Sequence, residues 1–147
     1  MIGVIDYKAG NAPSVLNALQ KLNIPSSLVS TPYEIEKSDG IILPGVGSAQ
    51  ATMDSLKELN ILDVLEDKIM KRNTPFLGIC IGLQVLFEYS EEGNAKCLGW
   101  FSGHVKKFNN QKVRVPQIGW NEVRFFREHQ ILASIDSSEY FYFVNSY

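Results

Sequence analysis

The first half of the chain alternates short apolar runs with stretches in which apolar residues recur every three or four positions. The short runs predict four strands, at residues 1–5, 26–29, 39–44 and 75–77. The stretches between them predict helices, whose apolar residues fall within 15–22, 53–59 and 61–70. Strands that alternate with helices in this way indicate an α/β fold, with an open, mostly parallel sheet and helices on both faces.

The pattern changes after residue 90. Residues 91–94 predict a turn, and the apolar segments that follow are short and strand-like. They predict strands at 97–101, 104–108, 112–115, 122–126 and 140–144. Because no linker, repeat or low-complexity segment interrupts the chain, we expect residues 1–147 to form one domain, whose second half adds antiparallel strands.

The segment GICIG at residues 78–82 joins the fourth predicted strand to a predicted helix at 83–88. It is the cysteine form of the G-x-S-x-G nucleophile elbow, in which glycines leave room for a sharp strand-to-helix turn. At the start of a helix Cys80 would face unpaired backbone amides, which stabilise a thiolate. Cys80 is therefore a candidate nucleophile. The alternative is a small buried core cysteine, but such a residue needs neither glycine.

A second glycine-bearing turn, at residues 44–48, follows the third predicted strand. Ligands bind at the carboxyl ends of parallel strands in open α/β sheets, so we expect this turn and the elbow to face one crevice. By itself the turn suits a loop whose glycines serve turn geometry, and it lacks the spacing of phosphate-binding and dinucleotide-binding loops. Beside a nucleophile elbow it becomes a candidate oxyanion hole.

Composition narrows the classes of function. A hydrophobic fraction of 45% and a charged fraction of 20% are those of an ordinary soluble globular protein. The net charge of -2 offers no basic stripe for nucleic acid, and no apolar run is long enough to span a membrane. The two cysteines, Cys80 and Cys97, are not spaced as zinc ligands or as a disulfide scaffold. We therefore expect a cytoplasmic protein without a metal or cofactor.

Four segments carry a resemblance to a known family: IILPGVG at 41–47, PFLGICIGLQVLF at 75–87, PQIGWN at 116–121 and YFVNSY at 142–147. They resemble class I (triad-type) glutamine amidotransferases and, within that class, the glutaminase subunits of imidazole glycerol phosphate synthases, from histidine biosynthesis. Asp6-Tyr7 and Gly10-Asn11 match as well, so the resemblance covers nearly the whole chain. It implies a flavodoxin-like fold and glutamine as the substrate.

The resemblance implies that glutamine is hydrolysed through a thioester, with Cys80 attacking the side-chain amide carbon. The oxyanion would be held by the backbone amides of Ile81 and of the turn at Val46 and Gly47. The positions that hold glutamine in the family correspond here to Gly45, Gly47, Gln84, Asn145, Ser146 and Tyr147. Judged from its position alone, Gln84 would be an ordinary solvated helix residue.

The resemblance also implies a partner. In the family, ammonia passes to a (βα)8-barrel synthase subunit (HisF type) within a heterodimer. The corresponding interface positions are Lys8, Gln117, Trp120 and Asn121, and the alternative for Trp120 is a core aromatic residue. Lys8 stands where the family usually has glycine, Gln117 and Asn145 where it usually has histidine, and Pro13 where a basic residue is common. These departures favour, as an alternative, a paralogue that supplies ammonia to a sugar-modifying synthase.

The catalytic histidine and glutamate of the class belong to a segment that follows the Tyr-Phe-Val strand, and Tyr147 is the last residue here. His104 and His129 have polar sequence surroundings, so we expect them at the surface. We therefore expect a domain that lacks its C-terminal portion, with an incomplete site and little glutaminase turnover. A docking or regulatory pseudoenzyme is one alternative. A second alternative is another cysteine hydrolase of this fold, but the family matches at Gln84 and residues 116–121 argue against it.

Overall fold

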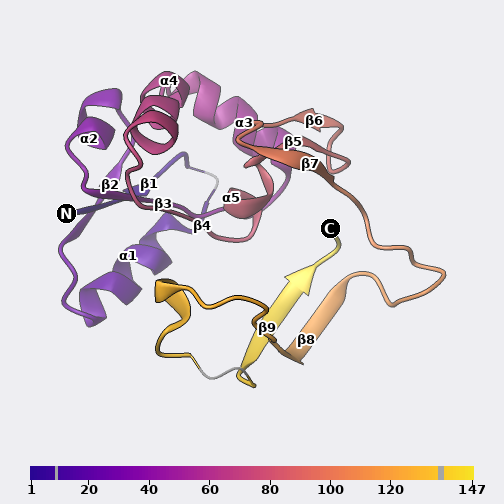
Figure 1. The fold of residues 1–147 in the computed structure, drawn as a ribbon. Coiled ribbons are helices and arrows are strands. Elements are labelled where there is room, and N and C mark those ends of the chain that lie inside the picture. Colours follow the sequence, from indigo (N-terminus) through magenta and orange to yellow (C-terminus); the bar gives the residue numbers. More distant parts are fainter. Residues whose placement is uncertain (9, 136–137) are drawn as a thin grey trace. The chain divides into compact units, whose positions relative to one another are not determined.

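The computed structural model describes residues 1–8, 10–135 and 138–147 (Figure 1). The chain forms two compact units, Met1–Lys106 and Lys107–Tyr147, and we describe each by itself. The first unit contains the elbow and the glycine-bearing turn, and the second contains the segments PQIGWN and YFVNSY.

A four-stranded parallel sheet forms the centre of the first unit. Its strands are β1 (Ile2–Ile5), β2 (Ser26–Val29), β3 (Gly40–Leu43) and β4 (Phe76–Gly78), in the order β2-β1-β3-β4. Ile2 of β1 pairs with Ser26 of β2 on one side and with Gly40 of β3 on the other. All four strands that the apolar runs predicted are confirmed.

Helices cover both faces of this sheet, as the alternation of strands and helices predicted. Successive residues of a strand point to opposite faces, and Val4 and Ile42 pack with Ala12 of α1 (Ala12–Lys21) in one core. Ile5 and Leu43, one residue further along their strands, join the other core. That core also contains residues of α2 (Pro32–Glu36), α3 (Ala49–Glu58) and α4 (Leu62–Glu66). Figure 1 shows α1 on one side of the sheet and these three helices on the other.

Side-chain caps decide where two of these helices begin. The Thr31 hydroxyl accepts a hydrogen bond from the Glu34 amide, and the Glu34 carboxylate accepts one from the Thr31 amide, which completes a capping box. The Ser48 hydroxyl accepts a hydrogen bond from the Ala51 amide at 3.3 Å. Because Ser48 also ends the turn at 44–48, this cap ties the turn to the start of α3.

The helix α4 runs directly into a π-helical turn, η1 (Asp67–Lys71). Arg72, which follows η1, donates two hydrogen bonds to the Glu36 carboxylate at 2.7 and 2.6 Å. It also forms an ion pair with Asp67 at 2.9 Å. The buried Lys68 donates to the Glu36 carbonyl oxygen at 2.8 Å. These contacts join η1 to the end of α2.

The helix after the elbow is shorter than predicted. It ends after a single turn, as α5 (Ile81–Gln84), and the chain continues as strand β5 (Phe87–Ser90). The predicted helix after the elbow is therefore present, but its predicted extent to residue 88 is wrong. A short apolar run cannot by itself distinguish a helix from a buried strand. Here the Leu86 carbonyl oxygen accepts a hydrogen bond from the distant Phe101 amide at 3.0 Å, and such long-range pairing replaces the helical bonds.

A small second sheet in this unit consists of β5, β6 (Ala95–Lys96) and β7 (Phe101–Val105), in the order β6-β5-β7. The predicted turn at 91–94 connects β5 to β6 and is confirmed. The predicted strand at 97–101 is wrong, because Gly99 takes a φ of 69° and turns the chain before β7 begins. The predicted strand at 104–108 overlaps only the end of β7.

The second unit contains an antiparallel ribbon of two strands, β8 (Gln117–Glu122) and β9 (Tyr140–Asn145). The predicted strand at 140–144 is confirmed. The predicted strand at 112–115 is wrong, because that segment forms turns and bends. The one predicted at 122–126 begins where β8 ends, since the residues of β8 that pair with β9 lie further towards the amino end. Cross-strand pairing, rather than local alternation, decides these bounds.

Candidate active site

Cys80 sits between the end of β4 and the start of α5, in a backbone conformation that L-residues rarely adopt. Its φ is 55° and its ψ is -114°. The Cys80 carbonyl oxygen accepts hydrogen bonds from the amides of Leu83 and Gln84, at 3.0 and 3.1 Å. On the other side, the Ile79 amide donates to the Leu43 carbonyl oxygen at 3.0 Å. The sharp strand-to-helix elbow predicted from the GICIG segment is confirmed.

Close backbone contacts require both glycines of the elbow. A β-carbon on Gly78 would lie 2.5 Å from the Gly82 carbonyl oxygen. A β-carbon on Gly82 would lie 1.9 Å from the Leu43 carbonyl oxygen. Both distances are far below van der Waals contact, so a side chain on Gly78 would force the strand and helix of the elbow apart, and one on Gly82 would push the elbow away from β3. The glycine spacing therefore has the steric cause expected for a nucleophile elbow.

The two cysteines differ in exposure: Cys80 is exposed and Cys97 is buried. Burial raises the pKa of the Cys97 thiol, whose sulfur lies 3.6 Å from the Ala95 carbonyl oxygen. Because the thiolate is the nucleophilic form, Cys97 is disfavoured as a nucleophile. The alternative considered for Cys80, a small buried core cysteine, applies to Cys97 instead.

The turn at 44–48 lies against the elbow, at the carboxyl ends of β3 and β4. A β-carbon on Gly45 would lie 2.8 Å from both the Gly82 amide nitrogen and the Ile81 β-carbon. Gly47 has a φ of 96°, and Val46 between them is exposed. Ile81 is the first residue of α5, so its amide has no partner within that helix. Within the first unit, the structure thus brings Gly45 of the turn against Ile81 and Gly82, which follow Cys80 in the chain.

Gln84 Oε1 and Glu92 Oε2 are among the buried side-chain oxygen atoms of this unit that have no hydrogen-bond partner within the described residues. Gln84 is the last residue of α5. Glu92 belongs to a turn that packs on the start of α3, where a β-carbon on Gly93 would lie 2.8 Å from the Gln50 β-carbon. Burial raises the pKa of Glu92, although a hydrogen bond from the Ala49 amide opposes this shift. Unpaired buried acceptors suit a ligand that brings N–H donors.

The sequence-based prediction of the site omitted Glu92 and Tyr7. A glutamate within a polar turn shows no local signal that it will be buried. Tyr7 follows β1 and is 3% exposed, and its hydroxyl oxygen lies 3.1 Å from where a β-carbon on Gly45 would be. The Asp6-Tyr7 match contributed only to the family resemblance. Long-range packing brings Tyr7 to the turn at 44–48 and Glu92 to the start of α3, and no short-range pattern in the sequence could have shown this.

Most of the remaining predicted site residues lie on the ribbon of the second unit. Gln117 pairs with Asn145 across β8 and β9, and its side-chain amide donates to Asn121 Oδ1 at 2.8 Å. Trp120 is 68% exposed and packs edge-on against Tyr142, with ring centroids 5.5 Å apart. Trp120 is therefore a surface residue of the ribbon, and its alternative assignment as a core aromatic is wrong.

Residues Asn145, Ser146 and Tyr147 follow one another at the end of β9. The Ser146 carbonyl oxygen accepts a hydrogen bond from the Phe108 amide at 2.9 Å, and the Asn145 side-chain amide donates to the Tyr147 carbonyl oxygen at 2.9 Å. Asn145 Oδ1 is buried and has no hydrogen-bond partner within the described residues. The side-chain oxygen of Asn145 is thus a further unpaired acceptor.

Lys8, His104 and His129 are all exposed. Lys8 has a φ of 65°, in the left-handed region that suits the glycine usual at this position in the family. His104 Nε2 lies 3.9 Å from the Glu88 carboxylate. His129 Nδ1 accepts a hydrogen bond from the Ile131 amide at 3.2 Å and so caps the short 3-10 helix η2 (Gln130–Leu132). The expectation that both histidines are surface residues is confirmed.

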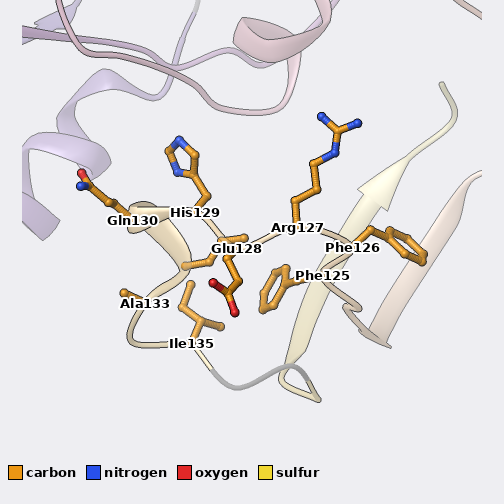
Figure 2. Close-up of a pocket in the computed structure, with 9 residues that line it drawn as sticks. Phe125, Phe126, Arg127, Glu128, His129, Gln130, Ala133 and Ile135 are labelled. Atoms are coloured by element: carbon orange, nitrogen blue, oxygen red, sulfur yellow. The ribbon is translucent and has the colours of Figure 1, made fainter.

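A hollow of about 950 Å³ lies in the segment between β8 and β9 (Figure 2). All the residues that line it come from 125–135, which includes η2. In Figure 2 the Phe125 ring and the Glu128 carboxylate point to the same side of this segment, and the Arg127 guanidinium points to the other. None of its lining residues was predicted as a site residue, and we assign it no function.

Among the described residues, no group of three or more histidine, cysteine, aspartate or glutamate side chains could hold a metal ion. The helices in the described part of the chain are all too short or too polar to cross a membrane.

Comparison with known proteins assigns this elbow to a family. A sequence model of the family "Glutamine amidotransferase class-I" matches residues 3–144. The chain belongs to the class-I glutamine amidotransferase family. The resemblance drawn from the four sequence segments is thereby confirmed.

Relatives of this amidotransferase chain are similar along its whole length. Imidazole glycerol phosphate synthase subunit HisH from Leptospira interrogans is 45% identical over 151 residues, which cover 100% of this chain and 74% of that protein. The corresponding subunit HisH 2 from Methanococcus maripaludis is 39% identical, with 100% and 73% covered. A crystal structure of a glutamine amidotransferase matches with a TM-score of 0.73 at 19% identity, over 97% of this chain and 70% of that one. This likeness confirms the fold.

Proposed function

We propose that this amidotransferase hydrolyses glutamine to glutamate and ammonia, as the glutaminase subunit of an imidazole glycerol phosphate synthase in histidine biosynthesis. One observation carries the proposal: the exposed Cys80 stands on a strained elbow, directly beside a glycine-bearing turn. The names of the relatives support the choice of synthase. The proposed location is the cytoplasm.

The proposed reaction passes through a thioester. The Cys80 thiolate attacks the side-chain amide carbon of glutamine, and the C–N bond breaks as the nitrogen takes up a proton and leaves as ammonia. Water then attacks the thioester carbon, which releases glutamate and returns the thiol. Both steps put negative charge on the former amide oxygen. We assign its stabilisation to the backbone amides of Ile81, Val46 and Gly47, and the contact between Gly45 and Ile81 supports this assignment.

We assign substrate binding to groups that lack partners. Gln84 Oε1 and Glu92 Oε2 have no hydrogen-bond partner among the described residues, and glutamine brings an amide NH₂ and an α-ammonium as donors. Gly45 and Gly47 carry no side chain that would keep a ligand from the backbone of the turn. The backbone of residues 145–147 is proposed, from the family resemblance, to receive the amino-acid end of the substrate.

The proposed partner is a (βα)8-barrel synthase subunit of HisF type, which forms a heterodimer with this chain and receives the ammonia. The exposed Trp120 and the hydrogen-bonded pair of Gln117 and Asn121 support a docking surface on the ribbon. The exposed Lys8 supports a second one on the first unit. A sugar-modifying synthase is the alternative acceptor, because Gln117 and Asn145 replace histidines that are usual in the family.

A second candidate function is a docking or regulatory subunit without turnover. In the family, a histidine oriented by a glutamate takes and returns the proton of the reacting thiol. The observation that favours this second function is that His104 and His129, the histidines among the described residues, are exposed and have local roles. His129 caps η2, and His104 packs against Tyr89 with ring centroids 5.6 Å apart.

The test measures ammonia release from glutamine by the full-length protein, including the family's catalytic histidine and glutamate, with and without the barrel subunit. We expect release in the complex, and we expect Cys80→Ala to abolish it while Cys97→Ala, the matched control, retains it. Full activity in Cys80→Ala would exclude the thioester route. Glutamine binding by the wild-type complex without any ammonia release would instead favour the docking function.

A further inference from the structure

Tyr7 is held rigidly in the core of the first unit. Tyr7 is 3% exposed and belongs to the larger buried cluster of that unit. Gly10 lies against the ring, because a β-carbon on Gly10 would lie 3.1 Å from the ring carbon Cε1. A ring packed on its face and around its edge keeps its hydroxyl in one place.

The hydroxyl of Tyr7 lies beneath the turn at 44–48. A β-carbon on Gly45 would lie 3.1 Å from this hydroxyl oxygen and 2.8 Å from the Ile81 β-carbon. The same glycine therefore contacts Tyr7 on one side and the nucleophile elbow on the other. A shift of the tyrosine oxygen would therefore displace the turn first, and would reach Cys80 only through the turn.

Two buried hydroxyls come together at this point. Thr52, on α3, is 1% exposed, and neither its hydroxyl nor that of Tyr7 makes a hydrogen bond of standard geometry with a described residue. Burial raises the pKa of Tyr7, and a charged Cys80 would raise it further, while the Thr52 hydroxyl and the Val46 backbone amide act in the opposite direction. The Val46 amide and the Thr52 hydroxyl are thus the polar neighbours of the tyrosine oxygen. Unpaired hydroxyls in a core cost stability, so their presence beside a candidate site calls for a functional reason.

We propose that Tyr7 is a positioning residue for glutamine hydrolysis: its hydroxyl, with that of Thr52, supports the turn at 44–48 from beneath Gly45 and so keeps this turn against the elbow that carries Cys80. The inference rests on the proposed function. Tyr7 itself contacts no reacting atom and acts through the turn. A phenylalanine would fill the same space as the ring, but the oxygen that lies against Gly45 would be lost. Gly45 and Gly47 have no side chains that could restore the position of the turn.

The test compares two electrophiles on the thiol of the full chain. A chloroketone analogue of glutamine places a carbonyl oxygen in the oxyanion site, and the Cys80 sulfur bonds to the carbon that bears chlorine as chloride leaves. Iodoacetamide alkylates the same thiol with loss of iodide and does not use that site. We expect Tyr7→Phe to lower the maximal rate of chloroketone labelling about tenfold, with the half-saturating concentration and the iodoacetamide rate within about twofold of the wild type.

Tyr33→Phe is the matched control, because Tyr33 is an exposed tyrosine of α2, and it should change neither rate. Thr52→Val tests the second hydroxyl and takes the place of Tyr7→Phe if circular dichroism shows that the latter does not fold. An unchanged chloroketone rate, or an equal fall in both rates, would overturn the positioning role. Failure of the proposed function looks different, because glutamine would then give no protection against the chloroketone even in the wild-type chain.

Discussion

Gly82 and Leu43 approach each other so closely that a β-carbon on Gly82 would lie 1.9 Å from the Leu43 carbonyl oxygen. Leu43 is the last residue of β3, and Gly82 lies in α5, so this contact sets the distance between the sheet and the elbow. The Ile79 amide donates a hydrogen bond to the same oxygen at 3.0 Å. The Leu43 carbonyl oxygen therefore contacts the chain on both sides of Cys80, at Ile79 and at Gly82.

We expect Gly82→Ala to destabilise the fold by about 3 kcal/mol, because the clash is with backbone and only a movement of α5 away from β3 relieves it. Gly47→Ala is the matched control. There a β-carbon would meet none of the described atoms within 4 Å, so only the φ of 96° opposes the substitution. That conformational cost is about 1 kcal/mol. Urea unfolding followed by circular dichroism measures both, and equal losses would refute the steric role of Leu43.

Glu92 should make the protein less stable as the pH rises. Burial raises its pKa above the ordinary value of 4.5, so the folded chain holds this proton more tightly than the unfolded chain does. The stability that results is fully present when the pH is below the ordinary pKa of a glutamate. It is lost as the pH rises through the raised pKa of Glu92. Glu92→Gln keeps the shape and removes the charge. It should therefore raise the melting temperature at pH 7 and lose this advantage below the ordinary pKa of a glutamate.

The control for Glu92 is Glu58→Gln, which removes one charge from an exposed residue of α3. Thermal unfolding of the three proteins across this pH range gives the comparison. A Glu92→Gln variant that is no more stable than the wild type at pH 7, once the effect of Glu58→Gln is subtracted, would show that burial does not disfavour the charged carboxylate.

Arg72 should stabilise the junction of α2 and η1 in a pH-dependent way. Its two hydrogen bonds lower the pKa of Glu36 below the ordinary value of 4.5. A lowered carboxyl pKa stabilises the folded protein when the pH is above the ordinary pKa of a glutamate. This stability is lost as the pH falls through the lowered pKa of Glu36. Arg72→Met should therefore lower the melting temperature more at pH 7 than at pH 3. The effect is modest, because Arg72 and Glu36 both remain accessible to solvent and salt screens their attraction.

Lys71→Met is the matched control for Arg72, because Lys71 pairs with Asp67 through one contact at 3.4 Å. A bidentate guanidinium pair is stronger than a single ammonium contact, so this variant should lose less. Melting temperatures at low and high salt measure the difference. If Lys71→Met lowers the melting temperature as much as Arg72→Met or more, the two-bond geometry of Arg72 adds nothing to stability.

The elbow could be predicted from the sequence because its cause is local. Gly78 and Gly82 flank Cys80 at a fixed spacing, and the close contacts that require them lie within the elbow or at the adjacent strand. The four parallel strands were predictable for a related reason. The clearest cases are β1 and β3, which are short apolar runs with mostly buried residues, so the pattern of apolar residues carries the information.

The errors came from segments whose structure depends on distant residues. The chain at 83–88 has the composition of a helix, yet it leaves the helix at Gln84 because Leu86 pairs with Phe101. The predicted strand at 122–126 failed because β9 pairs with the residues before it. In both cases long-range hydrogen bonds outweighed the local preference, which is worth only fractions of a kcal/mol per residue.

The sequence by itself determined the family, the α/β fold and the position of the candidate nucleophile, because short-range spacing specifies turns and apolar runs specify buried strands. Only the tertiary structure decided that Cys80 is the exposed thiol and Cys97 the buried one. It alone brought Tyr7 beneath the turn at 44–48 and buried Glu92 against α3. Burial and contact between residues far apart in the chain arise from how whole elements pack, and no local pattern encodes that packing.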